Sequence, residues 1–205
     1  MYLYPKWIRA WHVLNAVLFV ILIITGLNIH YADNETTSAG VKEIATVKRH
    51  NIAAFLLIIN YIVFVTGNII TNNGRYYRIE GKGIIGNSYI QLKYYLSGMF
   101  KGEKRPFPVN EVQKFNPLQK LSYVIAMYIA VPLLIISGIS LFLPDLPLPE
   151  ILTLSGSVYM NILHISTGFF LSLFIIIHIY TCTLGSKPSS LFTGIITGYH
   201  VSDES

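Results

Sequence analysis

The sequence predicts an all-α membrane protein, a four-transmembrane-helix bundle. Of its 205 residues, 53% are hydrophobic and 12% are charged, and this charged share is about half of that in ordinary soluble domains. Four apolar stretches are each longer than the ~18 residues that indicate a membrane-spanning helix. They are Trp11–Ile29, Ile52–Ile70, Leu121–Leu143 and Val158–Leu184. Composition and stretch length together exclude a soluble globular protein.

We expect one integral membrane domain over residues 1–205. Its spans are expected at residues of about 8–29, 50–71, 117–143 and 157–184. The first apolar stretch is too long for the apolar region of a cleavable signal, so we expect it to remain as a span. No internal repeat stands out. The single cysteine, Cys182, excludes a disulfide framework, a CxxC zinc site and the CxxCH attachment of c-type haem.

The basic residues lie on one side of the predicted spans. Twelve of the 15 lysines and arginines lie before span one, in or beside the connection between spans two and three, or in the C-terminal tail. The other three, Lys42, Lys48 and Arg49, lie in the first loop on the opposite side. The positive-inside rule therefore predicts that both termini face the cytoplasm. Because the basic residues flank spans, the net charge of +5 indicates a lipid bilayer as partner and not nucleic acid.

The connections between the spans differ in composition. The cytoplasmic connection 72–116 contains Tyr89–Leu96, whose tyrosines and lysine predict an interfacial helix. A solvated loop with one helix and no specific role is an equally good interpretation. The outer loop Asp33–Arg49 is polar, and the outer segment Pro144–Glu150 is rich in proline. Either outer loop could dock a partner protein.

Four of the six histidines lie within or at the ends of the apolar stretches: His12, His50, His164 and His178. An ionisable side chain at membrane depth costs at least a few kcal/mol unless it has a partner, so each is a candidate functional residue. A single such histidine would more often be a hydrogen-bonded core residue. In the predicted orientation, His12 and His178 share the cytoplasmic depth, whereas His50 and His164 share the outer depth.

The spacing on span four supports two separate sites. His164 and His178 are 14 residues apart, nearly four helical turns, so both leave the same helix face with a rise of ~21 Å between them. One metal ion cannot join them, because a zinc–nitrogen bond is only ~2 Å long. Imidazoles from two helices, with no sulfur or carboxylate nearby in sequence, suit bis-imidazole haem better than zinc or copper. We therefore expect haems between helices, ligated by the pairs His12/His178 and His50/His164.

Three glycines are candidates for close approach of a planar cofactor. Gly168 lies one turn from His164, and Gly26 and Gly67 lie on other spans. Small residues also serve ordinary helix packing in membranes, so that alternative stays open. His30 and His200 are assigned no ligand role, because one lies at the edge of span one and the other in a polar tail.

Four motifs point to one known family. They are Arg9–Ala16 opening span one, His50 opening span two, Phe115–Lys120 opening span three, and the spacing from His164 to His178. With them the chain resembles, over essentially its whole length, the bacterial di-haem cytochrome b subunits of formate dehydrogenases, nickel–iron hydrogenases and thiosulfate reductases. The resemblance implies two haem b groups with the pairing just described. It also implies a prokaryotic cytoplasmic (inner) membrane.

The same resemblance implies a quinone site, for menaquinone or ubiquinone, near the cytoplasmic-side haem. In the formate dehydrogenase type, an asparagine that opens span three and the surroundings of the inner ligand contact the quinone. Asn116 and His178 occupy the matching positions, and Gln119 is a further candidate. Asn116 before Pro117 is also an ordinary helix N-cap, and that alternative stays open.

The preferred function is an electron-transfer and membrane-anchor subunit of a respiratory oxidoreductase. It would pass electrons between the quinone pool and an extracytoplasmic iron–sulfur or multihaem subunit that serves a catalytic subunit. A close alternative is a stand-alone cytochrome b561 that reacts with quinone and a soluble donor. A carrier or pore is disfavoured, because no Asp or Glu enters a span and the histidines lie near the two faces rather than at the midplane.

Overall fold

The computed structural model describes residues 2–32, 37–79, 83–110, 113–143, 145–150, 155–185 and 188–199. For residues 37–42 it describes the backbone alone. Over the described residues the chain is helical, without strands beyond one isolated antiparallel bridge between Tyr2 and Tyr199. The predicted all-α class is confirmed.

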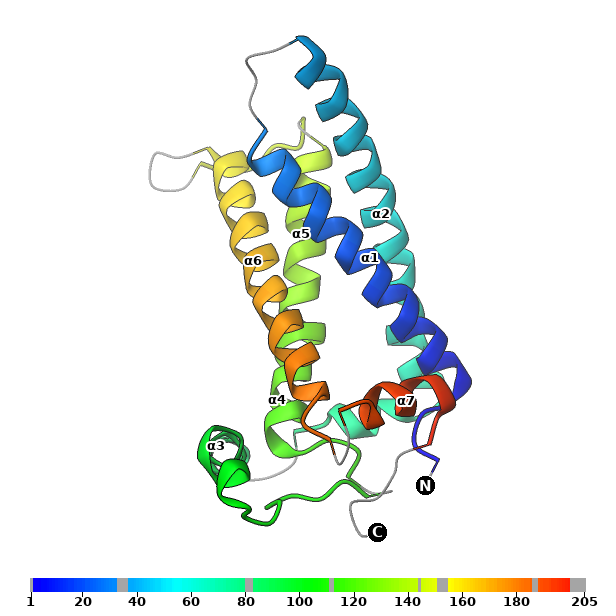
Figure 1. The fold of residues 1–205 in the computed structure, drawn as a ribbon. Coiled ribbons are helices and arrows are strands. Elements are labelled where there is room, and N and C mark those ends of the chain that lie inside the picture. Colours follow the sequence, from blue (N-terminus) through cyan, green and yellow to red (C-terminus); the bar gives the residue numbers. More distant parts are fainter. Residues whose placement is uncertain are drawn as a thin grey trace. The chain divides into compact units, whose positions relative to one another are not determined.

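Four helical segments are long and apolar enough to cross a membrane: Lys6–His30, Glu43–Ile70, Pro117–Phe142 and Gly156–Cys182. The helices that form them are drawn in Figure 1 and are α1 (Lys6–His30), α2 (Thr37–Ile70), α4 (Pro117–Ile125), α5 (Val131–Phe142) and α6 (Gly156–Cys182). The third segment joins α4 to α5 through a π-helical turn, η4 (Ala126–Ala130). The four helices predicted from the apolar stretches are therefore present.

The spans carry exposed apolar side chains and buried polar ones. Val17 of α1 and Phe169 of α6 are exposed, whereas Asn60, Ser137 and Thr167 are buried. Soluble proteins rarely expose extensive apolar surface, but lipid-facing helices do so as a rule. This pattern fits helices whose outer faces contact acyl chains and whose polar groups pair inside the bundle.

Helix α2 begins earlier than the sequence suggested. It starts at Thr37, so the expectation of a polar loop over Asp33–Arg49 is wrong for residues 37–49, while residues 33–36 lie outside the described residues. Alanine, lysine, glutamate and arginine, which have high helix propensity, make up about half of this stretch, and it contains no proline. Extending an existing helix also avoids the cost of nucleation. Polarity alone was therefore a poor signal for a loop.

The chain divides into two compact units, and each is described by itself. The first unit contains Met1–Pro5, Asn68–Pro132 and Phe174–Ser205, and the second unit contains Lys6–Gly67 and Leu133–Leu173. Each unit thus collects segments that are distant in sequence. The expectation of one domain over residues 1–205 stays a prediction.

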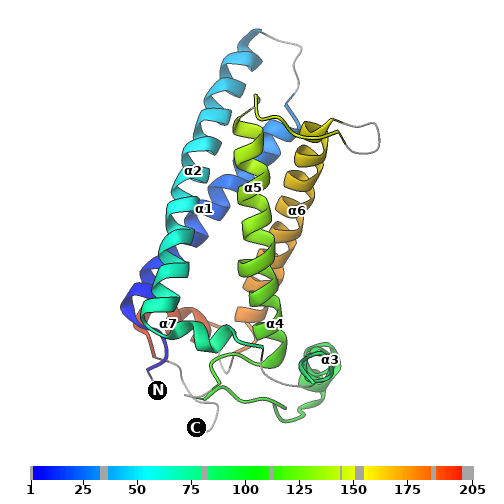
Figure 2. The same cartoon turned by 180° about the vertical axis from the view of Figure 1, so that it is seen from behind.

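In the second unit, α1 runs alongside α2 (Figures 1 and 2). The Trp11 indole nitrogen donates a hydrogen bond to the Asn60 carbonyl oxygen at 3.0 Å, and the Trp11 ring stacks on Phe64 with ring centres 4.5 Å apart. A Cβ atom on Gly67 would lie 2.6 Å from the Trp7 ring. Gly67 therefore serves helix packing, which is one of the two roles that the sequence left open for it.

The π-helical turn η4 precedes a proline in span three. Pro132 is the second residue of α5, it has no backbone N–H, and its ring would collide with the carbonyl of residue 128 in a regular α-helix. A π turn over Ala126–Ala130 widens the helix at this point and relieves the collision. The span therefore continues through the proline without ending.

The first unit contains the long connection between spans two and three. Its helical segments are η1 (Asn73–Tyr77), α3 (Ile84–Lys93), the π-helical η2 (Tyr94–Gly98) and η3 (Met99–Lys101). The helix predicted over Tyr89–Leu96 is therefore present and longer than expected, and Figure 2 shows α3 beside α4. Its apolar Ile85 is exposed while its polar Ser88 and Gln91 are buried, a polarity suited to an apolar face against lipid. That interfacial role stays a prediction.

A short helix near the C-terminus, α7 (Ser190–Thr197), was not expected. Gly198 ends it with φ of 90°, a conformation that favours glycine. The Gly198 carbonyl oxygen accepts hydrogen bonds from the backbone N–H groups of Leu3 (3.0 Å) and Tyr4 (3.2 Å). These bonds tie the N-terminal segment to α7 within the first unit.

Candidate functional site

His50 of α2 and His164 of α6 face each other in the second unit. Their ring centres lie 6.3 Å apart and their planes are inclined by 72°. Metal–nitrogen bonds of ~2 Å on either side of one iron, with each ring centre roughly 1 Å behind its nitrogen, put the ring centres about 6 Å apart. The two imidazoles therefore have the spacing of axial ligands on a single haem.

Both histidines lie on the inward faces of their helices. Leu57 is seven residues after His50 and Leu171 is seven residues after His164, so each leucine shares a face with its histidine two turns away. Both leucines are buried. The two histidines are themselves half-buried. The pair of imidazoles is therefore flanked by buried apolar side chains.

Each imidazole contacts a hydroxyl group from a neighbouring helix. The Thr25 hydroxyl of α1 lies 2.9 Å from the Nδ1 atom of His50, and the Ser137 hydroxyl of α5 lies 3.1 Å from the Nδ1 atom of His164. Hydrogen-bonding groups of this kind orient metal-ligating histidines in many proteins. The opposite ring nitrogen, Nε2, is then left for a ligand.

The donor set suits haem better than a bare metal ion. Within the described residues, no group of three or more His, Cys, Asp or Glu side chains gathers at one point. A porphyrin supplies the equatorial ligands itself, so iron in haem needs only the two axial imidazoles. The paired histidines of the second unit meet that requirement.

His178 of α6 lies in the first unit among aromatic rings. Its Nδ1 atom is 3.4 Å from the Tyr123 hydroxyl, and its ring stacks on Phe174 with centres 5.9 Å apart and planes inclined by 12°. The Cys182 sulfur lies 3.9 Å from Nε2, one turn further along the helix. The hydroxyl at Nδ1 is a feature that His178 shares with His50 and His164.

His12 of α1 lies in the second unit and is half-buried. Its ring meets the Trp11 ring edge-on at 6.3 Å, and Trp11 is itself fixed by Asn60 and Phe64. His12 and His178 thus belong to different units. Their pairing on one haem stays a prediction.

Asn116 and Gln119 together cap the N-terminus of α4. The Asn116 side-chain oxygen accepts from the Gln119 backbone N–H (2.9 Å), and the Gln119 side-chain oxygen accepts from the Asn116 backbone N–H (3.2 Å). With Pro117 at the first helical position, this is a complete capping box. The helix-cap interpretation of Asn116 is confirmed, and its quinone role stays a prediction.

The Asn116 amide also reaches a buried polar group. Its Nδ2 atom donates to the Tyr95 hydroxyl at 2.9 Å. Burial raises the pKa of Tyr95, while the Asn116 hydrogen bond and the Arg105 guanidinium act in the opposite direction. Gln91 lies within hydrogen-bonding reach of the same hydroxyl, and its own side-chain oxygen is buried without a partner among the described residues. Amide, phenol and guanidinium groups therefore converge at the start of span three.

Lys114 lies two residues before this cap in a buried position. Its ammonium donates to the Asn73 side-chain oxygen at 3.3 Å and lies 4.0 Å from the centre of the Tyr76 ring. Burial, reinforced by the positive charge of Arg75, lowers the pKa of Lys114 to about 8. The cap region therefore contains a lysine that releases its proton more easily than usual.

His30 lies exposed at the end of α1, with its ring 4.8 Å from Tyr31. His200 lies outside the described residues. Within the described chain, His30 thus lacks the buried setting of the ligand candidates.

Known proteins similar to this chain settle its family. The family of prokaryotic cytochrome b561 proteins matches residues 3–198. A curated relative from Escherichia coli (strain K12), "Putative cytochrome YdhU", is 37% identical over 206 residues, which covers 98% of this chain and 74% of the relative. The chain belongs to the prokaryotic cytochrome b561 family. No solved structure matches the chain at a significant level.

Membership of the cytochrome b561 family gives the chain its broad activity. It is a multi-pass protein of the prokaryotic inner membrane that binds haem b and transfers electrons. The resemblance to cytochrome b proteins that the sequence motifs indicated is thereby confirmed.

The sequence analysis did not predict a role for two residues that contact the histidines of this cytochrome, Thr25 and Ser137. A signal for them existed, because Leu22–Leu27 reads LIITGL and Leu134–Ile139 reads LIISGI. This short repeat places a hydroxyl followed by glycine on each of two helices. The match is only six residues long and lies within apolar stretches, so it does not stand out as an internal repeat of the chain.

The glycines of the cytochrome differ in the side chains that lie against them. A Cβ atom on Gly138 would lie 3.1 Å from the His164 ring and one on Gly26 would lie 3.5 Å from the His50 ring. A Cβ atom on Gly168 would meet only Leu134, at 3.8 Å. Gly26 and Gly138 therefore leave room for the imidazoles, while the contact at Gly168 is ordinary packing.

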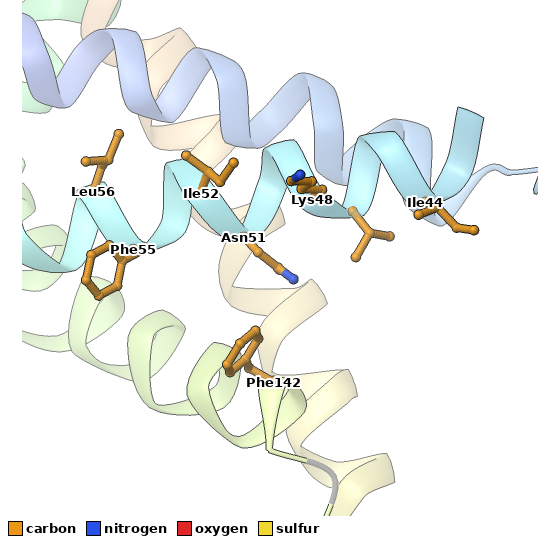
Figure 3. A pocket seen from close by; sticks show the side chains of 8 residues that line it. Ile44, Lys48, Asn51, Ile52, Phe55, Leu56 and Phe142 are labelled. Atoms are coloured by element: carbon orange, nitrogen blue, oxygen red, sulfur yellow. The ribbon is translucent and has the colours of Figure 1, made fainter. Parts of the chain in front are cut away.

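A separate groove lies along α2 in the second unit (Figure 3). It has a volume of about 570 Å³ and is lined by Ile44, Val47, Lys48, Asn51, Ile52, Phe55, Leu56 and Phe142. His50 is not among these residues. Its walls are apolar apart from Lys48 and Asn51, so it offers no axial ligand, and we assign it no role in binding haem.

Proposed function

We propose that this chain is a di-haem b electron-transfer subunit that links the quinone pool to an extracytoplasmic redox partner. The family supports haem b and electron transfer as its broad activity. The finer role rests on the residues described above. The single observation that carries it is the facing pair His50 and His164, at 6.3 Å, within one unit.

His50 and His164 hold one haem in this proposal. Each would use its Nε2 atom as an axial ligand, since Nδ1 already contacts a hydroxyl. The ligands come from α2 and α6, so binding also ties these helices together. When bound, haem supplies one-electron redox chemistry, and the protein supplies position and electrostatics.

His12 and His178 hold the second haem. His178 has a hydroxyl on Nδ1, from Tyr123, and stacks on Phe174, as expected of an oriented ligand. His12 is a half-buried imidazole near the start of an apolar helix, and its ring meets the Trp11 ring edge-on. Two imidazoles of this kind complete an axial pair.

We place a quinone site at the start of span three. The Asn116 amide keeps one hydrogen beyond the bond to Tyr95, and that hydrogen can be donated to a quinone carbonyl. The buried Gln91 side-chain oxygen has no partner among the described residues. It can accept a hydrogen bond from a hydroxyl group of a quinol. Phe115 meets Tyr123 edge-on at 5.0 Å, and Tyr123 contacts His178, so the site adjoins a ligand candidate within the first unit.

The distribution of basic residues supports one orientation of the chain in the membrane. Because most basic residues flank the start of span one and the connection 72–116, we propose that both termini lie in the cytoplasm. His50 and His164 would then serve an outer haem, which exchanges electrons with an iron–sulfur or multihaem partner. Asn116 and His178 would lie on the cytoplasmic side, where quinone reacts.

The haem count tests the proposal directly. A pyridine haemochrome assay on the purified, fully loaded protein should give about two protohaems per chain. His30→Ala is the matched control, because His30 is an exposed histidine at the end of a span, and it should leave the count unchanged. A count of one or none in the loaded wild type would overturn the di-haem proposal.

The subunit role needs a second experiment, because a stand-alone cytochrome b561 fits the family equally well. Mild solubilisation and affinity purification from the native host should bring down stoichiometric iron–sulfur or multihaem chains. A lone chain that reduces quinone with a soluble donor would favour the stand-alone function. Both outcomes leave the haem count untouched, so the two questions are separable.

A further inference from the structure

The two imidazoles of the second unit have the same kind of neighbour, a hydroxyl residue that is followed by a glycine. His50 is approached by Thr25, which Gly26 follows, and His164 is approached by Ser137, which Gly138 follows. In each case the hydroxyl comes from the helix that precedes the histidine's own helix along the chain. The two helix pairs, α1 with α2 and α5 with α6, thus present equivalent contacts to their histidines.

The hydroxyl hydrogens are already used within their own helices. The Thr25 oxygen lies 2.7 Å from the Ile21 carbonyl oxygen, and the Ser137 oxygen lies 2.8 Å from the Leu133 carbonyl oxygen. A carbonyl oxygen can only accept, so each hydroxyl must donate its single hydrogen there. The lone pairs of the hydroxyl oxygens then remain for the imidazoles.

An oxygen that only accepts requires a donor on the other side. The Nδ1 atoms of His50 and His164, at 2.9 and 3.1 Å, must therefore carry their ring hydrogens. A neutral imidazole has one N–H, so Nε2 is bare in both rings and has a free lone pair. The hydroxyls thereby select the tautomer that can bind a metal through Nε2. His164 also has a hydrogen bond with the Leu134 backbone, so Ser137 is one of its two polar partners.

Because Thr25 and Ser137 are buried, their hydroxyls strongly favour one tautomer of each histidine. Thr25 is 7% exposed and the Ser137 side chain is 0% exposed, so water cannot replace either hydroxyl at Nδ1. An unpaired Nδ1–H in an apolar setting would be costly. The following glycines leave the room that the rings need, since a Cβ atom on Gly138 would approach His164 to 3.1 Å.

We propose that Thr25 and Ser137 are positioning residues that fix the tautomer of His50 and His164 and thereby tune one haem. The inference rests on the proposed function, in which this pair ligates a single haem. A hydrogen bond accepted from Nδ1–H makes Nε2 a stronger donor, which favours ferric over ferrous iron. Both hydroxyls therefore lower the midpoint potential of the same haem.

Redox titration of the purified cytochrome tests the proposal. In Thr25→Val and in Ser137→Ala, the haem count should stay at the wild-type value and one spectral component should shift to higher midpoint potential. The same component should shift in both variants, and further in the double variant. Its low-temperature electron paramagnetic resonance signal should change with it.

Matched variants separate orientation from packing. Thr25→Ser and Ser137→Thr keep the hydroxyl groups, so both variants should retain the wild-type midpoint potential. Thr66→Val removes a hydroxyl that bonds the Ile62 carbonyl in the same way but lies exposed on α2, and it should change neither component. Two bound haems with unshifted potentials in Thr25→Val and Ser137→Ala would overturn this inference alone. Shifts in different components would contradict the pairing of His50 with His164, and a wild-type count below two would contradict the di-haem function.

Discussion

Asn116 has two structural partners, and each uses a different atom of its amide. The oxygen caps α4 and the nitrogen donates to Tyr95. A cap requires only an oxygen at this position, whereas a bond to a quinone carbonyl requires the N–H group. Substitutions that keep one atom and remove the other can therefore separate the confirmed role from the proposed one.

We predict that Asn116→Ser slows quinone-linked haem oxidation while leaving both haems bound. Serine retains a capping oxygen, so helix stability should change little, whereas Asn116→Ala should cost about 0.5–2 kcal/mol through the lost cap. Stopped-flow oxidation by a quinone analogue measures the rate, and thermal unfolding in detergent measures the stability. Unchanged quinone kinetics in Asn116→Ser would contradict the quinone role and leave Asn116 with its two structural contacts.

Lys114 gives the cap region a pH dependence of stability. Burial lowers its pKa in the folded protein to about 8 from 10.5, so between these values the unfolded chain binds more protons than the folded chain. The free energy of unfolding should therefore rise with pH across this window, by at most about 1.4 kcal/mol per pH unit. It should level off below pH 8, where both states hold the proton.

Thermal unfolding of Lys114→Gln across the same window checks this prediction. The variant should lose the part of the pH dependence that Lys114 contributes, while Lys101→Gln, at an exposed lysine, should retain the wild-type profile. Comparison with wild type at each pH cancels the ionisation of tyrosines. Identical profiles for wild type and Lys114→Gln would show that Lys114 is not the source.

The sequence predicts some of these residues better than others for a physical reason. Asn116, Pro117 and Gln119 form a local pattern, so their cap is readable from three neighbouring positions. Thr25 acts on His50 across 25 residues, and Ser137 acts on His164 across 27. A hydroxyl in an apolar helix usually bonds its own backbone, so the short match between the two helices is only a weak sequence signal for a second partner.

Helices α1 and α5 each place a glycine against a histidine of the next long helix, α2 and α6 respectively. Gly26 and Gly138 lie opposite imidazole rings, whereas Gly67 accommodates Trp7 and Gly168 lies near Leu134 alone. Helix boundaries were predictable where apolar length sets them, as in α6. The start of α2 was not, because helix propensity extends it to Thr37 beyond the apolar stretch.

We predict that Gly138→Ala perturbs the haem held by His164, whereas Gly168→Ala does not. The added methyl group at Gly138 would lie 3.1 Å from the His164 ring, but at Gly168 it would lie 3.8 Å from Leu134. Alanine favours a helix over glycine by ~1 kcal/mol, so a loss at Gly138 must come from the contact. Absorption spectra and haem content report the effect, and equal behaviour of the two variants would contradict the assignment.

In the whole molecule, α6 is the element that carries two ligand candidates. His164 and His178 lie on this one continuous helix, and each contacts a hydroxyl through Nδ1. The sequence predicted the four spans and these histidines, because apolar length and ionisable residues within it are strong signals. The two-hydroxyl arrangement and the α7 helix needed the structure, since neither has a strong sequence signature.

The most direct test of this account is the haem content of single and double histidine variants. If His50 and His164 hold one haem together, His50→Ala, His164→Ala and the double variant should each retain about one haem per chain, with the same spectral component missing. Combining His50→Ala with His12→Ala should instead remove both haems. A double variant of His50 and His164 that loses more haem than either single variant would show that the two histidines serve different haems, and would contradict the account.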